Sequence, residues 1–215
     1  MVLKDSYNRP VTNLRISLTP RCNLSCIYCH AEGEKSPADS MSVDEIREIL
    51  RVADKFGIRH VKFTGGEPLL RKDLTEIIST VPKSMESSIT TNGVLLERLA
   101  ADLKRAGLTR LNVSLDSLNR ETYKRITGSD RLDEVLSGID AALESGLRPI
   151  KLNMVVLSGI NESEVENFLA FVRGRRDLIL QLIELMHFSG CTDHGDIAVL
   201  EKDLEKRSRT IMTRR

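Results

Sequence analysis

Apolar positions along the chain follow two alternating periods. Short runs rich in β-branched and aliphatic residues predict six buried strands, which span residues 14–18, 58–63, 87–91, 110–115, 150–156 and 178–185. The stretches between these runs have the wider spacing of amphipathic helices. Two of the helices begin with a capping pattern, Ser42–Glu45 and Asn161–Glu164, in which a capping side chain is followed three residues later by glutamate.

Six strand and helix pairs in this order predict a parallel sheet, because the helix after each strand must pack back onto the sheet. We expect an α/β fold whose sheet curves into an open, partial (β/α)6 barrel of the TIM type. A flat doubly wound sheet is the alternative that the same alternation allows. The length of 215 residues fits one domain with one sizeable core, so we assign residues 1–215 to a single domain.

Small, polar and glycine-rich segments follow all of the predicted strands. In chain order they read TPRCNLSC, TGGEPL, TNG, LDSLN, LSGIN and MHFSG. In parallel α/β folds the carboxyl ends of the strands form the face that binds ligands. We therefore expect the functional site along this edge of the sheet, although each segment alone is typical of a turn.

Charge and hydropathy exclude several classes of partner. Lys and Arg total 32 against 31 Asp and Glu, so no strong field directs the chain to nucleic acid or to a membrane surface. No apolar run approaches the roughly 20 residues that cross a bilayer, and the first residues, MVLKDSYNRP, lack the apolar core of a signal peptide. We expect a cytoplasmic protein whose partner is a small molecule.

Three cysteines, Cys22, Cys26 and Cys29, lie close together directly after the first predicted strand. A clustered, odd set in a reducing compartment favours a metal or redox site over a disulfide framework. Thiolates suit zinc and iron–sulfur clusters. Zinc would need the adjacent His30 as fourth ligand, and neighbouring residues rarely turn both side chains onto one ion. A cubane cluster on three cysteines instead leaves one iron open for a small molecule.

The segment CNLSCIYC, with Tyr28 directly before the third cysteine, resembles the signature loop of the radical S-adenosylmethionine (SAM) superfamily. The segment TGGEP follows the second strand, where that superfamily carries a glycine-rich stretch lining the methionine end of SAM. Gly65 and Gly66 let the backbone approach a ligand closely, and we expect Glu67 to anchor the turn.

The resemblance extends through most of the chain and narrows to the GTP cyclases that begin molybdenum cofactor biosynthesis. VKFTGGEPLLRKDL, AGLTRLNVSLDSLN and IKLNMVVLSGIN occur in that family's order, and YCHAEGE is most similar to its archaeal members. The resemblance implies a lyase with a catalytic [4Fe-4S] cluster on Cys22, Cys26 and Cys29, whose open iron binds SAM. A 5′-deoxyadenosyl radical then abstracts hydrogen from the ribose C3′ of GTP, and the carbon radical attacks guanine C8.

The resemblance also assigns further site residues by position. The cofactor-binding residues are Tyr28, Gly65, Gly66, Glu67, Ser114 and Met186. The residues that bind GTP are Arg15, Lys62, Thr90 and Lys151. A triphosphate needs several cationic donors, which basic side chains around a barrel mouth supply, whereas a lysine in a strand can also face solvent. Asn92, Asp116 and Asn153 either orient the substrate or tie strand ends together.

The chain departs from the family pattern at three places. Lys62 and Gln181 stand where arginine is frequent. The family's second cluster uses three more cysteines in a carboxyl-terminal extension, whereas the remaining cysteine here is Cys191, which we interpret as a loop thiol. We therefore expect the chain to match the first two-thirds of a cyclase, with the second-cluster extension absent. Such a chain could cleave SAM slowly without converting GTP.

Two other interpretations stay open. One is a compact radical SAM enzyme of another family, of the deazapurine-forming or glycyl-radical-activating type, which would form deoxyadenosine with a substrate other than GTP. The other is a non-catalytic iron–sulfur and SAM-binding module, which would form no deoxyadenosine even under strong reduction. Both enzyme interpretations imply an electron donor as a further partner.

Overall fold

The computed structural model describes residues 2–29 and 41–185, and the fold is given for those residues. Six parallel strands form one sheet. They are β1 (Asn13–Ser17), β2 (His60–Thr64), β3 (Glu86–Thr91), β4 (Arg110–Ser114), β5 (Ile150–Val156) and β6 (Leu178–Glu184). Every strand begins and ends within two residues of its predicted bounds, which confirms the strand prediction. The assignment of residues 1–215 to one domain stays a prediction.

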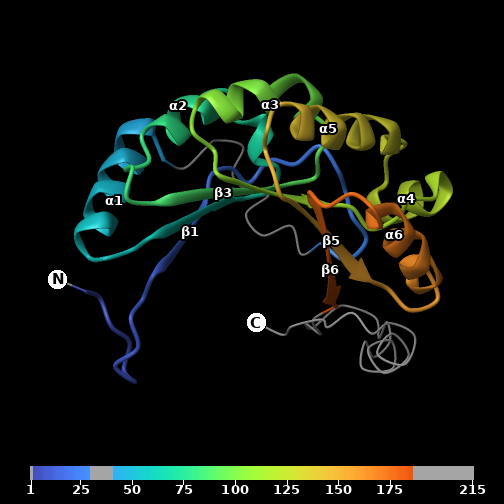
Figure 1. Ribbon diagram of the computed structural model, residues 1–215, viewed down its shortest axis with the longest axis horizontal. Helices are drawn as coiled ribbons and strands as arrows, with labels where there is room; N and C mark the ends of the chain where they lie inside the picture. Colours follow the sequence, from blue (N-terminus) through green and yellow to red (C-terminus); the bar gives the residue numbers. More distant parts are fainter. Residues whose placement is uncertain (1, 30–40, 186–215) are drawn as a thin grey trace.

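The order of the strands decides between the two predicted architectures. A doubly wound sheet reverses its winding at a switch point and so places strands out of chain order. Here the order is β1-β2-β3-β4-β5-β6, and each strand pairs with the next along the chain. Figure 1 shows the sheet arched, with the helices along its convex side. The open, partial barrel is therefore confirmed, and its concave side faces away from the helices.

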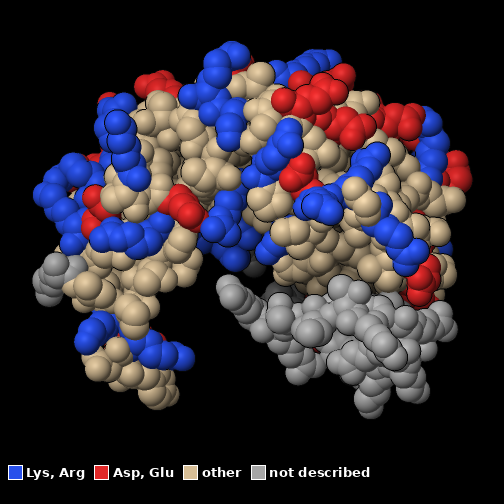
Figure 2. Space-filling model, viewed as in Figure 1, with Lys and Arg blue, Asp and Glu red and all other residues tan. Residues whose placement is uncertain are grey.

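Helices follow the strands and cover the convex side of the sheet. They are α1 (Val43–Lys55), α2 (Leu74–Ser79), α3 (Leu96–Arg105), α4 (Arg120–Thr127), α5 (Leu132–Glu144) and α6 (Val165–Val172), with 3-10 turns η1 (Pro68–Leu70) and η2 (Glu162–Glu164). No helix within residues 2–29 and 41–185 is long and apolar enough to cross a membrane. Figure 2 shows basic and acidic side chains interspersed over the surface, in keeping with the net charge of +1.

The two sides of the sheet differ in chemistry, because successive side chains of a strand point to opposite faces. Towards the helices the side chains are apolar and fully buried, as for Val61, Phe63 and Ile89. Burying each of them stabilises the fold by about 1.5–3 kcal/mol. The alternate positions on the concave side are mostly polar: Arg15 pairs in register with Lys62 on the next strand. A closed TIM barrel fills this space with branched apolar side chains, whereas here it is open to a ligand.

The two predicted helix caps have different outcomes. Ser42 accepts a hydrogen bond from the backbone of Glu45, and the Glu45 carboxylate accepts one from Ser42 N at 2.7 Å, which confirms the capping box at α1. The capping prediction at Asn161–Glu164 is wrong, because neither side chain caps the turn that follows. Both are buried and bind other segments instead.

Glu164 ties η2 to the turn after β4. Its carboxylate accepts hydrogen bonds from Ser117 Oγ at 2.8 Å, from Leu118 N at 2.9 Å and from Asn119 N at 3.2 Å. Asn161 joins the same two segments, since its amide donates to the carbonyl of Asp116 at 2.8 Å. Long-range partners therefore compete successfully for side chains that local spacing assigns to a cap.

Replacing Glu164 by glutamine is expected to lower the free energy of unfolding by about 1–3 kcal/mol. The amide offers one acceptor oxygen where the carboxylate offers two, and its buried NH2 group is itself a donor that faces the same three donors. Chemical denaturation followed by circular dichroism measures the change. The control Glu97→Gln alters an exposed glutamate of α3 and is expected to change stability by less than about 0.5 kcal/mol. Equal unfolding midpoints for the two variants would contradict the anchoring role of Glu164.

Candidate functional site

The three clustered cysteines lie in the loop after β1, at the carboxyl edge of the sheet, and we call residues 19–29 the cysteine loop. Cys22 and Cys29 are exposed, Cys26 is half-buried, and all three are free thiols. Burial, then the charge of Asp116, then the two neighbouring cysteines raise the pKa of Cys26 to about 12. Because the Cys26 thiol is protonated at neutral pH, binding a metal to it must release a proton.

The donor set fits an iron–sulfur cluster better than a single metal ion. In the described part of the chain, no three His, Cys, Asp or Glu side chains are grouped so that they could hold one ion. In a four-iron cluster each cysteine thiolate binds a different iron, so the cysteine sulfurs lie farther apart than they do around a single ion. His30, the fourth ligand of the zinc alternative, and Cys191 both lie outside the described residues.

The turn after β2 supports the cysteine loop through its backbone. Gly66 N donates to Thr19 O at 2.8 Å, and Glu67 N donates to Arg21 O at 2.7 Å. A Cβ atom at Gly65 or Gly66 would overlap the carbonyl oxygen of Thr19 or Arg21, and Gly65 has a φ of 142°. Both positions therefore require glycine. The close approach expected towards a ligand is made here to the protein's own cysteine loop.

Glu67 anchors this turn, as the sequence predicts. Its side chain is buried, and its carboxylate accepts hydrogen bonds from Leu69 N (2.9 Å), Thr91 Oγ1 (2.7 Å) and Asn92 N (2.7 Å). Burial raises the pKa of Glu67, and the three donors oppose that rise. The carboxylate thus joins the ends of β2 and β3, while its assignment to cofactor binding stays a prediction.

Asn92 and Arg71 hold the cysteine loop through their side chains. Asn92 Nδ2 donates to Asn23 Oδ1 at 2.7 Å, which ties the end of β3 to the cysteine loop. The guanidinium of Arg71 is 2% exposed and donates to Leu18 O at 2.9 Å and Met41 O at 2.6 Å. It therefore holds the backbone on both sides of residues 19–40. Sequence reasoning missed Arg71. The one signal in the sequence is that a cation stands just before α2, where the positive end of the helix dipole is unfavourable for a cation.

Tyr28 connects the cysteine loop to the ends of β4 and β5. Its hydroxyl donates to Asp116 Oδ2 at 2.6 Å, and Asp116 Oδ1 accepts from Val155 N at 2.8 Å. Burial raises the pKa of Asp116 to about 6, against the effect of these two hydrogen bonds. Burial also raises the pKa of Tyr28, so its hydroxyl stays protonated and donates. Asp116 thus ties strand ends together, which is the structural one of its two predicted roles.

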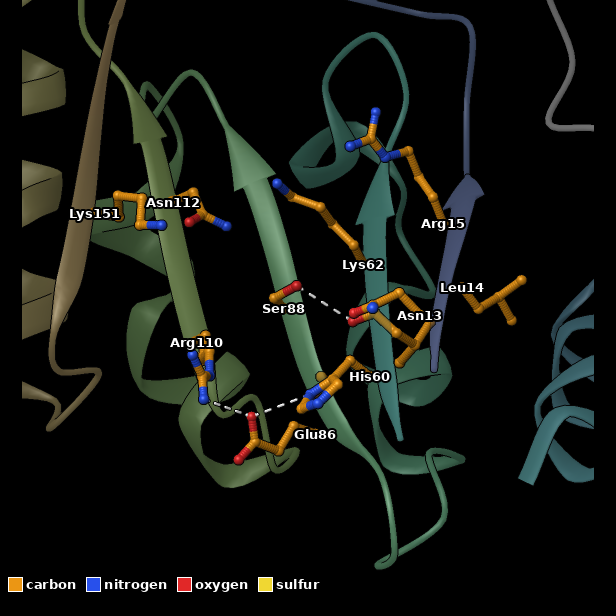
Figure 3. Close-up of a pocket in the computed structure, with 12 residues that line it drawn as sticks. Asn13, Leu14, Arg15, His60, Lys62, Glu86, Ser88, Arg110, Asn112 and Lys151 are labelled. Atoms are coloured by element: carbon orange, nitrogen blue, oxygen red, sulfur yellow. Dashed lines mark hydrogen bonds and ion pairs between the residues drawn. The ribbon is translucent and has the colours of Figure 1, made fainter. Parts of the chain in front are cut away.

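A cavity of about 440 Å³ lies on the concave side of the sheet (Figure 3). This volume is within the range of roughly 300–1,000 Å³ that is usual for small-molecule sites. Three of the four predicted substrate residues line it, namely Arg15, Lys62 and Lys151, which project from β1, β2 and β5. The structure therefore brings together residues that are far apart in the sequence.

The cations of this cavity repel one another. Burial, then the charges of Arg15 and Lys151, lower the pKa of Lys62 from its ordinary value. The acidic residue that lines the cavity, Glu86, binds Arg110 at 2.8 Å and His60 at 3.3 Å instead of these three cations. An anionic ligand with several charges would relieve the repulsion.

Two buried polar atoms near the carboxyl edge have no hydrogen-bond partner among the described residues. They are Thr90 Oγ1 and Asn153 Oδ1. Thr90 pairs in register with Asn112 of the cavity, and Asn153 with Ser114. Because buried polar atoms are normally hydrogen-bonded, both are suited to meet a ligand. The predicted residue Met186 lies outside the described residues.

The amino-acid sequence is similar to a family of archaeal proteins. The model of the radical SAM superfamily matches residues 16–172. Proteins named "Probable GTP 3′,8-cyclase" from Methanocella arvoryzae and Archaeoglobus fulgidus are each 49% identical, over 96% and 100% of this chain and 68% and 73% of their own lengths. The protein of that name from Methanosarcina mazei is 50% identical over 99% of this chain and 67% of its own length.

Solved structures share the fold at low sequence identity. SuiB of Streptococcus suis bound to S-adenosylmethionine has a TM-score of 0.75 at 19% identity, covering 91% of this chain and 44% of that chain. The enzyme anSMEcpe with bound AdoMet has a TM-score of 0.69 at 20% identity, covering 86% and 55%. The chain therefore belongs to the radical SAM superfamily, whose members use a [4Fe-4S] cluster and SAM, and to the family of these archaeal relatives.

Proposed function

We propose that this radical SAM enzyme cyclises GTP, the reaction in the names of its archaeal relatives. The observation that carries the proposal is the group of three cations, Arg15, Lys62 and Lys151, on the concave side of the sheet. Arg15 stands in the strand that leads directly into the cysteine loop. Arg15, which we propose binds the polyanionic substrate, is therefore close along the chain to the cysteine loop.

A triphosphate is the group that these cations suit. Arginine offers a planar fork of donors to phosphate oxygens, and lysine offers a compact charge that adapts to the oxygen nearest to it. Burial, and then the charges of Arg15 and Lys151, lower the pKa of Lys62, and a phosphate chain would neutralise these positive charges. Thr90 adds a hydroxyl without a partner among the described residues, which suits it to bind an oxygen of the same ligand.

We assign Cys22, Cys26 and Cys29 as the ligands of the [4Fe-4S] cluster, with the fourth iron open to the amino and carboxylate groups of SAM. When bound, this cluster supplies the electron that cleaves SAM and so provides the 5′-deoxyadenosyl radical. Ser114 ends β4 at the same edge of the sheet and is proposed as a contact to the cofactor. The cysteine loop, the turn after β2 and the end of β4 together form the cofactor side of the site.

The chemistry proposed for GTP needs its ribose held near that cofactor side. The cations bind the triphosphate, and the 5′-deoxyadenosyl radical takes the hydrogen from ribose C3′ to become 5′-deoxyadenosine. The C3′ radical then bonds to guanine C8 and closes a ring, and the cyclised radical takes up one electron from the electron donor and one proton. An electron donor for the cluster and a cytoplasmic location belong to the same proposal, because thiolate-bound clusters with an open iron survive in a reducing compartment.

Anaerobic reconstitution with iron and sulfide, followed by incubation with SAM, dithionite and GTP, tests this function. We expect about four irons per chain, deoxyadenosine and a cyclised nucleotide. Cys26→Ala removes a cluster ligand and is expected to abolish both products, whereas Cys191→Ala removes a thiol interpreted as incidental and should abolish neither. Four irons and deoxyadenosine formation that GTP does not stimulate would contradict GTP as the substrate. A chain that binds no cluster would contradict the whole proposal.

The role of the cations is tested by the affinity for GTP, measured by calorimetry at physiological ionic strength. Lys62→Met removes one charge-assisted contact and is expected to weaken binding about 10-fold or more. Lys72→Met makes the same charge change at an exposed site outside the cavity and should leave the affinity within about 2-fold, since surface charges are screened.

Lys62 also predicts a pH dependence of GTP binding. Because a bound polyanion favours the charged amine, the pKa of Lys62 is higher in the complex than in the free chain, where it is lowered. The contribution of Lys62 to affinity is therefore complete below the pKa of the free chain and is lost as the pH rises through the pKa of the complex. Lys62→Met should remove this alkaline loss, and an unchanged pH profile would count against contact with phosphate.

A further inference from the structure

A buried carboxylate holds the aromatic residue between the second and third cysteines. The hydrogen bond of 2.6 Å from the Tyr28 hydroxyl to Asp116 Oδ2 joins residues 88 positions apart. Hydrogen bonds to a charged oxygen are shorter and stronger than neutral ones. Asp116 is 3% exposed and lies two residues after the end of β4.

The position of Asp116 is set independently of Tyr28. Its second carboxylate oxygen accepts from Val155 N at 2.8 Å, and its carbonyl oxygen accepts from Asn161 Nδ2 at 2.8 Å. Asn161 is itself fixed, since its Oδ1 accepts from Leu157 N at 2.7 Å. Asp116 is thus tied to β5 and to the segment after it, and its bond to Tyr28 joins the cysteine loop to these elements.

The remaining contacts of this half of the cysteine loop come from its backbone and from apolar packing. Ser25 N donates to Thr127 O at 3.0 Å, and Ile27 N donates to Ile126 O at 2.9 Å. The side chain of Tyr28 packs on a small apolar cluster around Ile126 and Leu157. Apolar packing is not directional, so the hydroxyl bond to Asp116 is the contact that sets the orientation of Tyr28.

We propose that Asp116 is a positioning residue, which holds Tyr28 and thereby sets Cys26 and Cys29 in the arrangement that retains the cluster. It acts as partners in the outer shell of a metal site do, by orienting the residues that bind the metal. The inference rests on the proposed assignment of the cluster to the cysteines and does not depend on GTP as the substrate.

Tyr28→Phe and Asp116→Asn test the proposal by the rate at which a chelator removes iron from the reconstituted chain. Each variant is expected to lose its cluster about 10-fold faster than the unsubstituted chain. The double variant should lose its cluster no faster than the faster of the two single variants, because Asp116 acts through Tyr28.

Tyr123→Phe is the matched control. Tyr123 is a buried tyrosine of α4 whose hydroxyl has no hydrogen-bond partner in the described residues, and the charge of Cys26 affects its pKa as it affects that of Tyr28. The Tyr123→Phe variant is expected to retain iron as the unsubstituted chain does. The electron paramagnetic resonance (EPR) spectrum of its reduced cluster, with and without SAM, is also expected to be unchanged. Tyr28→Phe is expected to alter that spectrum while circular dichroism shows the same fold.

Full iron retention with unchanged spectra in Tyr28→Phe would overturn the inference, as would an equal loss in Tyr123→Phe. If Asp116→Asn does not fold, Tyr28→Phe still decides, because it removes one hydroxyl and leaves the buried carboxylate in place. If the unsubstituted chain itself takes up no iron, the cluster assignment fails and the inference with it. That result is distinct from a loss confined to the variants at Tyr28 and Asp116.

Discussion

The close backbone contact between the turn after β2 and the cysteine loop is the constraint on which the site depends. Gly66 N and Glu67 N donate to carbonyl groups of the loop, and no side chain fits between the two segments. The loop has no regular secondary structure, so neighbouring elements must fix its course. It is held by the turn after β2 on one side, by Asn92 after β3, and by Asp116 after β4. The segments after β2, β3 and β4 together thus hold the loop with its three cysteines at one edge of the sheet.

The arc of the sheet separates stability from binding. Its helix side carries the apolar core, whereas its concave side carries cations such as Arg15, Lys62 and Lys151, which oppose one another. Like charges in a half-buried cavity weaken the fold slightly, and a ligand of opposite charge recovers that free energy on binding. An open arc permits this arrangement, because its concave side does not have to be filled with apolar side chains.

Buried polar side chains at the carboxyl edge fall into two groups. Glu67, Arg71 and Glu164 bind backbone groups of neighbouring loops and act as scaffolding. Thr90 and Asn153 have a buried oxygen without a partner among the described residues. Since an unpaired buried oxygen costs free energy, the second group marks where the fold leaves room for something else to bind. Hydrogen-bond satisfaction therefore distinguishes the support of the site from the positions suited to a ligand.

The sequence by itself determined the strands, the parallel sheet and the cysteine loop, because periodicity and motif spacing are local properties of the chain. The cations of the cavity were named by the resemblance to the GTP cyclases. Tertiary structure alone decided that the sheet is an arc wound in chain order. It also decided that Gly65 and Gly66 face the cysteine loop. The partners of Asn161 and Glu164, about 45 residues away, replaced the cap that their spacing predicts. A buried polar side chain binds whichever loop meets it at the sheet edge, and this depends on how distant strands pair.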